Sequence, residues 1–164
     1  MLKASWHGTF SPMANITKRA SKQLKPGLEP GESVLAAVLL EPIGTYGLGG
    51  AVRNILVNRA ATQALSGAKA SSADDRCGTA GQFPSLPCAI AVTSTRVVAA
   101  LSNGVRYGAI EFSAPLGTVW ATVTSVPFAR RVEISFEDGS HFSADASKHQ
   151  PYDQFLAALS AAQG

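Results

Sequence analysis

Residues 89–101 read AIAVTSTRVVAAL, and this stretch decides the fold class. Two runs of small and β-branched apolar residues flank the polar pair Ser94-Thr95, as expected for two antiparallel strands joined by a tight turn. A second turn follows at Asn103-Gly104, and an Asn-Gly pair is the strongest short-range signal for a hairpin. The sequence therefore predicts a series of hairpins that starts near residue 89.

Further strand signals lie on both sides of these hairpins. Upstream, residues 33–40 (SVLAAVLL) predict a strand that is apolar on both faces and is therefore covered on both sides. Downstream, residues 131–136 (RVEISF) alternate between polar and apolar side chains, which is the pattern of a half-buried strand. Strands are also expected over 105–113, 116–124 and 141–144. The chain is thus predicted to be mainly β, with about seven antiparallel strands.

Three segments show helical periodicity instead. Residues 15–24 predict a short basic helix that ends at Pro26-Gly27. Residues from about 50 to 65 predict an amphipathic helix. A C-terminal helix is expected after Pro151, where one apolar stripe is formed by Tyr152, Phe155, Leu156 and Leu159.

The segment 44–85 is expected to be an insertion after the first strand. It holds the predicted helix 50–65, followed by the small and polar run 66–84 (SGAKASSADDRCGTAGQFP). Such a composition is typical of a flexible loop. We therefore predict an inserted helix and a flexible loop within an otherwise β domain.

Charge is distributed unevenly along the 164 residues. The formal net charge is +3, and the first 25 residues hold five basic side chains and no acidic one. We therefore expect a basic, partly flexible arm over 1–27, followed by one domain over 28–164. Such an arm favours acidic partners, such as an anionic lipid surface or a nucleic acid. Its basic cluster over 18–25 has no aromatic residue among the basic ones, so a nucleic-acid partner is not expected.

No secretory signal is expected from residues 1–12, because they contain no apolar run of the required length. Met13 is an alternative start, which leaves open whether residues 1–12 are present in the native protein. We expect a cytoplasmic protein in which Cys77 and Cys88 stay reduced, although a disulfide between them is left open.

Four segments occur in an order that resembles the pleckstrin-homology-like (PH-like) superfold, in its bacterial and GRAM-related versions. They are PGESVL at 30–35, AVTSTRVV at 91–98, VEISF at 132–136 with the turn that follows it, and the Phe155-Leu156 pair with Leu159. The resemblance covers about residues 28–162. It implies an antiparallel barrel of seven strands capped by the C-terminal helix; a six-stranded or lipocalin-like barrel is the alternative fold.

The chain departs from the phosphoinositide-binding members of that superfold, whose first hairpin carries a basic cluster. The insertion 44–85 replaces that hairpin, so inositol-phosphate binding at the usual place is in doubt. We expect instead a non-enzymatic binding module whose helix 50–65 contacts a membrane surface or a protein partner, since a wide exposed apolar face marks an interaction site. Packing of this helix on its own domain is the structural alternative, and self-association stays open. The expected interaction residues are Leu48, Val52, Arg53, Ile55, Leu56, Arg59, Arg130 and Arg131.

Motifs for catalysis, metal ligation and phosphate binding do not stand out in the sequence. We accordingly expect no catalytic residues, cofactor or metal. The alternative function is a small-molecule-binding barrel or an enzyme with chemistry near His141. On a strand, this histidine shares one face with Ser143 and Asp145.

Overall fold

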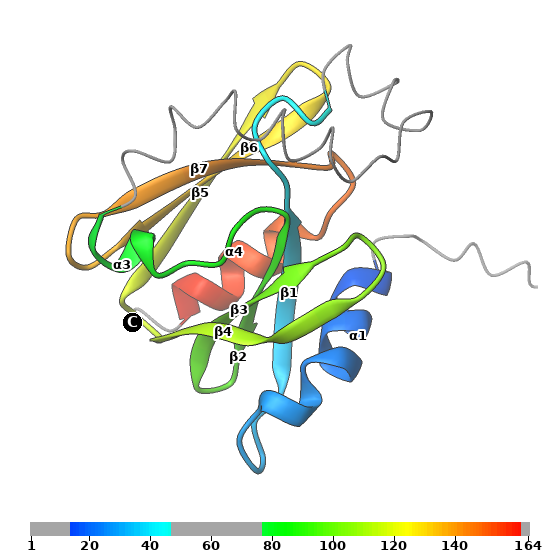
Figure 1. The fold of residues 1–164 in the computed structure, drawn as a ribbon, viewed down its shortest axis with the longest axis vertical. Coiled ribbons are helices and arrows are strands. Elements are labelled where there is room, and N and C mark those ends of the chain that lie inside the picture. The colour runs from blue at the N-terminus through cyan, green and yellow to red at the C-terminus, as the bar shows by residue number, and fades with distance from the viewer. Residues whose placement is uncertain (1–13, 47–76, 162–164) are drawn as a thin grey trace, which may run out of the picture.

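The computed structural model describes residues 14–46 and 77–161, which form two antiparallel sheets (Figure 1). The first sheet has the strand order β1-β2-β3-β4, and the second has the order β5-β6-β7. The strands are β1 (Val34–Leu40), β2 (Cys88–Thr93), β3 (Arg96–Ser102), β4 (Tyr107–Pro115), β5 (Val119–Val126), β6 (Ala129–Phe136) and β7 (His141–Ala146). The prediction of a mainly β chain with seven antiparallel strands and a C-terminal helix is confirmed.

The two sheets are not closed into a barrel. β4 and β5 follow each other along the chain, but they belong to different sheets. The sheets meet at another edge, where Glu41, just after β1, forms a two-bond backbone bridge with Asp145 of β7. The structure is therefore an open pair of sheets where the sequence predicted a closed barrel.

The main core lies between the two sheets and is covered by helix α4 (Tyr152–Ala161). Phe155 of α4 is completely buried, together with Ile90 of β2 and Ile134 of β6. This confirms the predicted apolar stripe, although Leu156 is only partly buried. Within residues 14–46 and 77–161, no helix has both the length and the apolarity needed to cross a membrane.

A second, smaller core lies on the opposite face of the four-stranded sheet. Helix α1 (Ala14–Gln23) and the short 3-10 helix η1 (Lys25–Gly27) run along this face, which buries Ala20 and Leu24 against Ala91 and Val98. This explains why the sequence of β1 is apolar on both faces. The structure thus makes α1 an integral part of the domain, whereas the sequence predicts a partly flexible arm over 1–27.

The residues just before β2 also differ from the flexible loop predicted over 66–84. Among the described part, 77–84, a short helix α3 (Gly78–Gly81) precedes the buried Phe83. The Phe83 ring packs against those of Phe112 and Phe142, with centroids 4.9 and 4.6 Å away. The Phe83 side chain thus contacts both sheets. Its segment is mostly small and polar, so the sequence predicts a loop there.

Two residues of the β6–β7 turn hold α3 in place. The Asp138 carboxylate accepts a hydrogen bond from the backbone N–H of Thr79, and the Ser140 hydroxyl accepts one from Ala80. Gly78 has a φ of +57°, and a Cβ at this position would clash with Asp138 Oδ2. The close approach of α3 to the turn therefore requires glycine at position 78.

The outer edge of β1 is closed by hydrogen bonds from three other elements. The Thr17 hydroxyl of α1 accepts from the N–H of Ala37. The side-chain amide of Gln150 binds both backbone groups of Leu39, and Asp145 pairs with Glu41 through the backbone bridge. Alternate backbone donors along this edge are thus satisfied, so β1 offers no free edge there.

Candidate functional site

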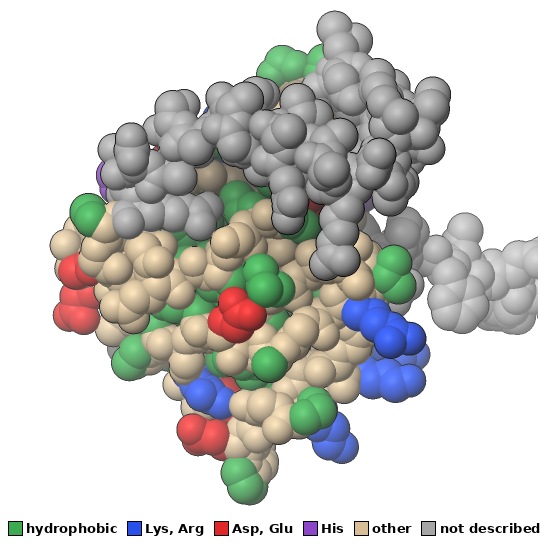
Figure 2. Space-filling model, viewed as in Figure 1, with side chains coloured by type: hydrophobic (Ala, Val, Ile, Leu, Met, Phe, Trp, Pro, Cys, Tyr) green, Lys and Arg blue, Asp and Glu red, His purple; other side chains and the backbone are tan. Residues whose placement is uncertain are grey.

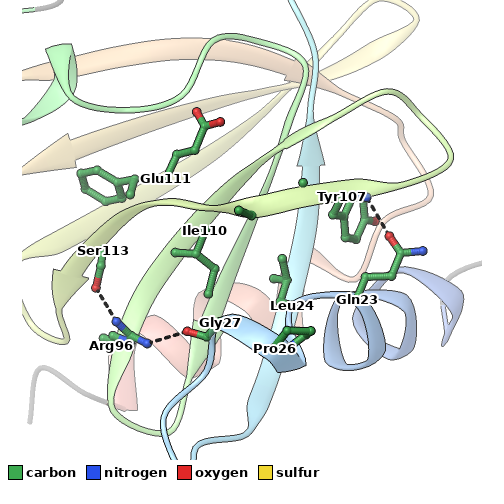
Figure 3. Close-up of a pocket in the computed structure, with 12 residues that line it drawn as sticks. Gln23, Leu24, Pro26, Gly27, Arg96, Tyr107, Ile110, Glu111 and Ser113 are labelled. Carbon is green, nitrogen blue, oxygen red and sulfur yellow. Dashed lines mark hydrogen bonds between the residues drawn. The ribbon is translucent and has the colours of Figure 1, made fainter.

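A groove of about 690 Å³ separates β4 from α1 and η1 (Figure 3). On the helical side it is lined by Gln23, Leu24, Pro26 and Gly27, and on the other side by the consecutive β4 residues 107–113. Successive strand residues point to opposite faces of a sheet. This groove is lined by every residue from 107 to 113, from both faces of β4. It therefore runs along the edge of the strand and not beneath one face of the sheet.

This edge of β4 is open in the described part of the chain. β4 is the last strand of its sheet, and no strand of the described ranges pairs with its outer side. The N–H of Tyr107 points to that side, because it donates to the side-chain oxygen of Gln23 at 2.7 Å. Between Tyr107 and Phe112 the pairing of β4 with β3 shifts register twice, so the outward donor that a hydrogen bond identifies is that of Tyr107. The groove therefore borders a strand-pairing group.

Apolar contacts form the floor of the groove. Leu24 is almost fully buried, and Ile110 packs against the same core cluster. η1 approaches β4 so closely that a Cβ at Gly27 would lie 3.0 Å from Cδ1 of Ile110. The glycine thus lets the chain seat against β4, with Pro26 beside it (Figure 3).

Arg96 closes the far end of the groove and belongs to a hydrogen-bond network around Glu32. Its guanidinium donates to both Glu32 carboxylate oxygens at 3.0 Å, and also to the backbone oxygen of Gly27. The Glu32 carboxylate further accepts from the hydroxyls of Thr93 and Thr95. These bonds join the residues on which the PH-like resemblance was based, PGE before β1 and TSTR between β2 and β3.

The Glu32 network has a clear electrostatic effect. The hydrogen bonds from Arg96, assisted by those from Thr93, lower the pKa of Glu32 from 4.5 to about 2, against the opposing effect of burial. The pKa of Arg96 is raised by the same carboxylate. The Glu32 side chain is fully shielded from solvent, whereas that of Arg96 is 22% exposed. Arg96 is therefore neutralised by a partner within the domain.

Basic residues adjoin, in sequence, the residues that line the groove, although they are not part of its lining. Lys22 is exposed on α1, and Lys25 is exposed at the start of η1. Arg106 is exposed just before β4, and Arg19 donates to the backbone oxygen of Gly104 in the same turn. Burial raises the pKa of the Tyr107 phenol, and the positive charge of Arg19 opposes that rise.

Most of the interaction residues predicted from the sequence lie outside the described residues. These are Leu48, Val52, Arg53, Ile55, Leu56 and Arg59, together with the rest of the predicted helix 50–65. Arg130 and Arg131 are consecutive on β6 and so point to opposite faces of the sheet. Arg131 donates to the buried carboxylate of Asp145 at 2.7 Å, which gives it a structural role.

The alternative site near His141 is only partly assembled. His141 is exposed at the start of β7, and Asp145 is buried at its far end. The Asp145 carboxylate accepts from Arg131 and from the N–H of Gly44, so both of its oxygens are engaged in the fold. Within the described ranges, no group of three or more His, Cys, Asp and Glu side chains is placed to hold a metal ion.

The groove itself was missed at the sequence level. The helix stop at Pro26-Gly27 and the hairpin at Asn103-Gly104 were both identified, but no local pattern indicates that they meet across a strand edge. The arrangement offers an outward backbone donor at Tyr107, an apolar floor and basic side chains nearby, which are the elements of a binding site. Comparison with protein-family models and with curated proteins finds no match to this sequence.

Proposed function

We propose that this chain is a non-enzymatic binding module with a PH-like fold, which takes an extended segment of a protein partner along the open edge of β4. The observation that carries the proposal is the contrast between the two edges of the first sheet. The edge of β1 is closed by Thr17, Gln150 and Asp145. The edge of β4 borders a groove instead.

Support for the PH-like fold comes from the order of the elements. The described strands divide into sheets of four and three, and helix α4 follows the last strand. The residues that carry the resemblance also contact each other, since Glu32 binds Thr93, Thr95 and Arg96. The separation of β4 from β5 leaves the first sheet with an edge on this side.

The mode of binding follows from the chemistry of a free strand edge. An extended peptide that adds a strand gains affinity from main-chain hydrogen bonds, and its alternate side chains enter neighbouring pockets. Here the N–H of Tyr107 already binds a side-chain oxygen, which a peptide carbonyl replaces readily. Leu24, Pro26 and Ile110 supply an apolar surface for side chains on the α1 side.

The predicted helix 50–65 remains a proposal for a second contact, with a protein or a membrane surface. An enzyme with chemistry near His141 has less support, because the nearest carboxylate on that strand face is engaged by Arg131. The same engagement weakens the case for Arg131 as an interaction residue. Binding at β4 is the function that the described geometry favours.

The proposal is tested with a random nonapeptide phage library selected on the purified full chain. Affinities of the selected peptides are then measured by fluorescence anisotropy. Each backbone amide of the best peptide is N-methylated in turn. We expect loss of binding at every second position, because only alternate amides of an added strand face β4. Uniform tolerance along the peptide, or failure to select any peptide, would overturn the proposal.

A pair of variants at one position provides the matched control. The side chain of Gln23 occupies the outward N–H of Tyr107. Gln23→Ala frees this donor, whereas Gln23→Glu keeps an acceptor oxygen at the same place. Since a net hydrogen bond contributes ~1 kcal/mol, we expect Gln23→Ala to tighten peptide binding by about fivefold. Gln23→Glu should not tighten it. If Gln23→Ala binds the peptide no better than wild type, the peptide does not pair with β4 at Tyr107.

A further inference from the structure

The charge around the groove points to the chemistry of the partner. Resting on the proposed function, we infer that the partner segment carries an acidic side chain where it passes the Tyr107 end of β4. An apolar side chain follows on the same face of the segment, over Leu24 and Ile110. The groove thus selects an acidic, extended peptide.

Basic residues are concentrated at this end of the molecule. The described ranges hold nine basic and nine acidic residues, so this part of the chain has no formal net charge. Five of the nine basic ones nevertheless belong to α1, η1 and the β3–β4 turn: Lys18, Arg19, Lys22, Lys25 and Arg106. Figure 2 shows Lys and Arg side chains gathered over α1 and the adjoining end of the sheet.

These cations are not neutralised by the described part of the domain. None of the five forms an ion pair with a carboxylate of residues 14–46 or 77–161, whereas Arg96 and Arg131 each have one. α1 has no acidic residue of its own. Glu111 is the one acidic residue that lines the groove, and Figure 3 shows its side chain on the side of β4 away from Pro26 and Gly27. The basic end therefore lacks a counter-charge and complements an anionic one.

The spacing of the expected motif follows from strand geometry. Gln23 contacts β4 at Tyr107, and Gly27 contacts it at Ile110, so α1 and η1 run alongside the strand. Side chains on one face of a strand lie two residues and roughly 7 Å apart. Tyr107 and Ile110 pair with Ser102 and Ala100 of β3, so the register shift in β4 leaves them two strand positions apart. An acidic side chain at the Tyr107 end thus places the residue two positions away over Ile110.

A peptide fits these observations better than the other anionic partners. The cations flank the edge of β4, and a peptide backbone adds to a strand edge through alternating donors and acceptors, which a lipid surface or a nucleic acid lacks. Stacking of nucleotide bases needs exposed aromatic rings, and Tyr107, the aromatic residue at this end of the groove, is buried. Lipid and nucleic acid therefore serve as competing outcomes of the test.

The test repeats the nonapeptide selection on Lys22→Glu and on Arg106→Glu. Lys148→Glu, which makes the same change of charge at an exposed site after β7, is the control. Wild type and Lys148→Glu should enrich Asp or Glu two positions from an apolar residue. The two groove variants should lose that enrichment. Replacing the selected acid by its amide should weaken binding to wild type about five-fold, and the loss should shrink at about 1 M salt.

Three outcomes would overturn the inference. In the first, peptides selected on all variants show the same enrichment of Asp or Glu. In the second, peptides selected on wild type show no such enrichment. The third is binding of vesicles with anionic lipid, or of duplex DNA, that Lys22→Glu abolishes while the peptide remains bound. In each case an alternating N-methyl pattern would leave strand addition at β4 intact, so failure of the inference is distinct from failure of the proposed function. No selected peptide at all would overturn both.

Discussion

Replacing Glu32 by glutamine should destabilise the fold in a way that depends on pH. One Glu32 oxygen accepts from the N–H of Glu29 and from Nη2 of Arg96, and the other accepts from Nε of Arg96 and from two threonine hydroxyls. A glutamine side chain has only one oxygen. In either orientation its NH₂ group meets a guanidinium N–H, donor against donor, in a site without solvent.

The size of the effect follows from the pKa of Glu32. Its pKa falls from 4.5 to about 2 in the folded chain, which corresponds to an upper limit of about 3 kcal/mol of stability at pH 7. Because the folded pKa is the lower one, this stability is fully present above pH 4.5 and is lost as the pH falls toward 2. At pH 3 about 1.4 kcal/mol remains. The gap between wild type and Glu32→Gln should thus narrow by about 2 kcal/mol between pH 7 and pH 3.

The measurement is urea unfolding of both proteins at the two pH values, followed by circular dichroism. At pH 7 a loss of about 3 kcal/mol should also lower the melting temperature by roughly 10 °C. Glu133→Gln is the control, since Glu133 is exposed on β6 and its replacement should cost less than about 0.5 kcal/mol at either pH. A Glu32→Gln protein as stable as wild type at pH 7, or a gap that does not change with pH, would refute this account of the network.

Two large-to-small substitutions test the core. Phe155→Ala removes a completely buried ring from α4 and should cost about 3–5 kcal/mol by urea unfolding; an unchanged unfolding curve would mean that the helix is detached from the core. Phe83→Ala removes the ring that joins β4 to β7 and should cost about 3 kcal/mol, whereas replacement of the exposed neighbour Gln82 by alanine should have little effect. If Phe83→Ala proves neutral, the segment before β2 is not part of the core.

The strands could be predicted because their signals are local. Alternation in 131–136, the Asn103-Gly104 turn and the run of apolar residues at 33–40 each identify a strand or its end. All three agree with the structure, in β6, the β3–β4 turn and β1. Whether the strands close into a barrel could not be predicted in the same way. Pairing between β4 and β5 depends on long-range contacts, which the local sequence of neither strand specifies.

Other parts of the structure depend on single residues in uninformative surroundings. Phe83 lies between small and polar residues, so composition predicts a loop, yet its ring is held by Phe112 and Phe142. The many basic residues around Lys18 and Lys22 predict a solvent-exposed arm. In the structure this segment is helix α1, and burial of Ala20 and Leu24 holds it against the first sheet. In both cases a few buried apolar groups outweigh the average character of the segment.

The candidate groove depends on how the two edges of one sheet are treated. A free edge is a hazard for aggregation, and natural sheets usually cover it. This chain covers the edge of β1 with donors and acceptors from three separate elements, and Gln150 alone binds both backbone groups of Leu39. At β4, by contrast, only Gln23 binds an outward backbone N–H among the bonds of the described residues, and α1 stands back far enough to leave a groove. An edge that is protected by positive charge repels a second basic edge while it attracts an acidic strand, so the same cations can prevent self-pairing and select a partner.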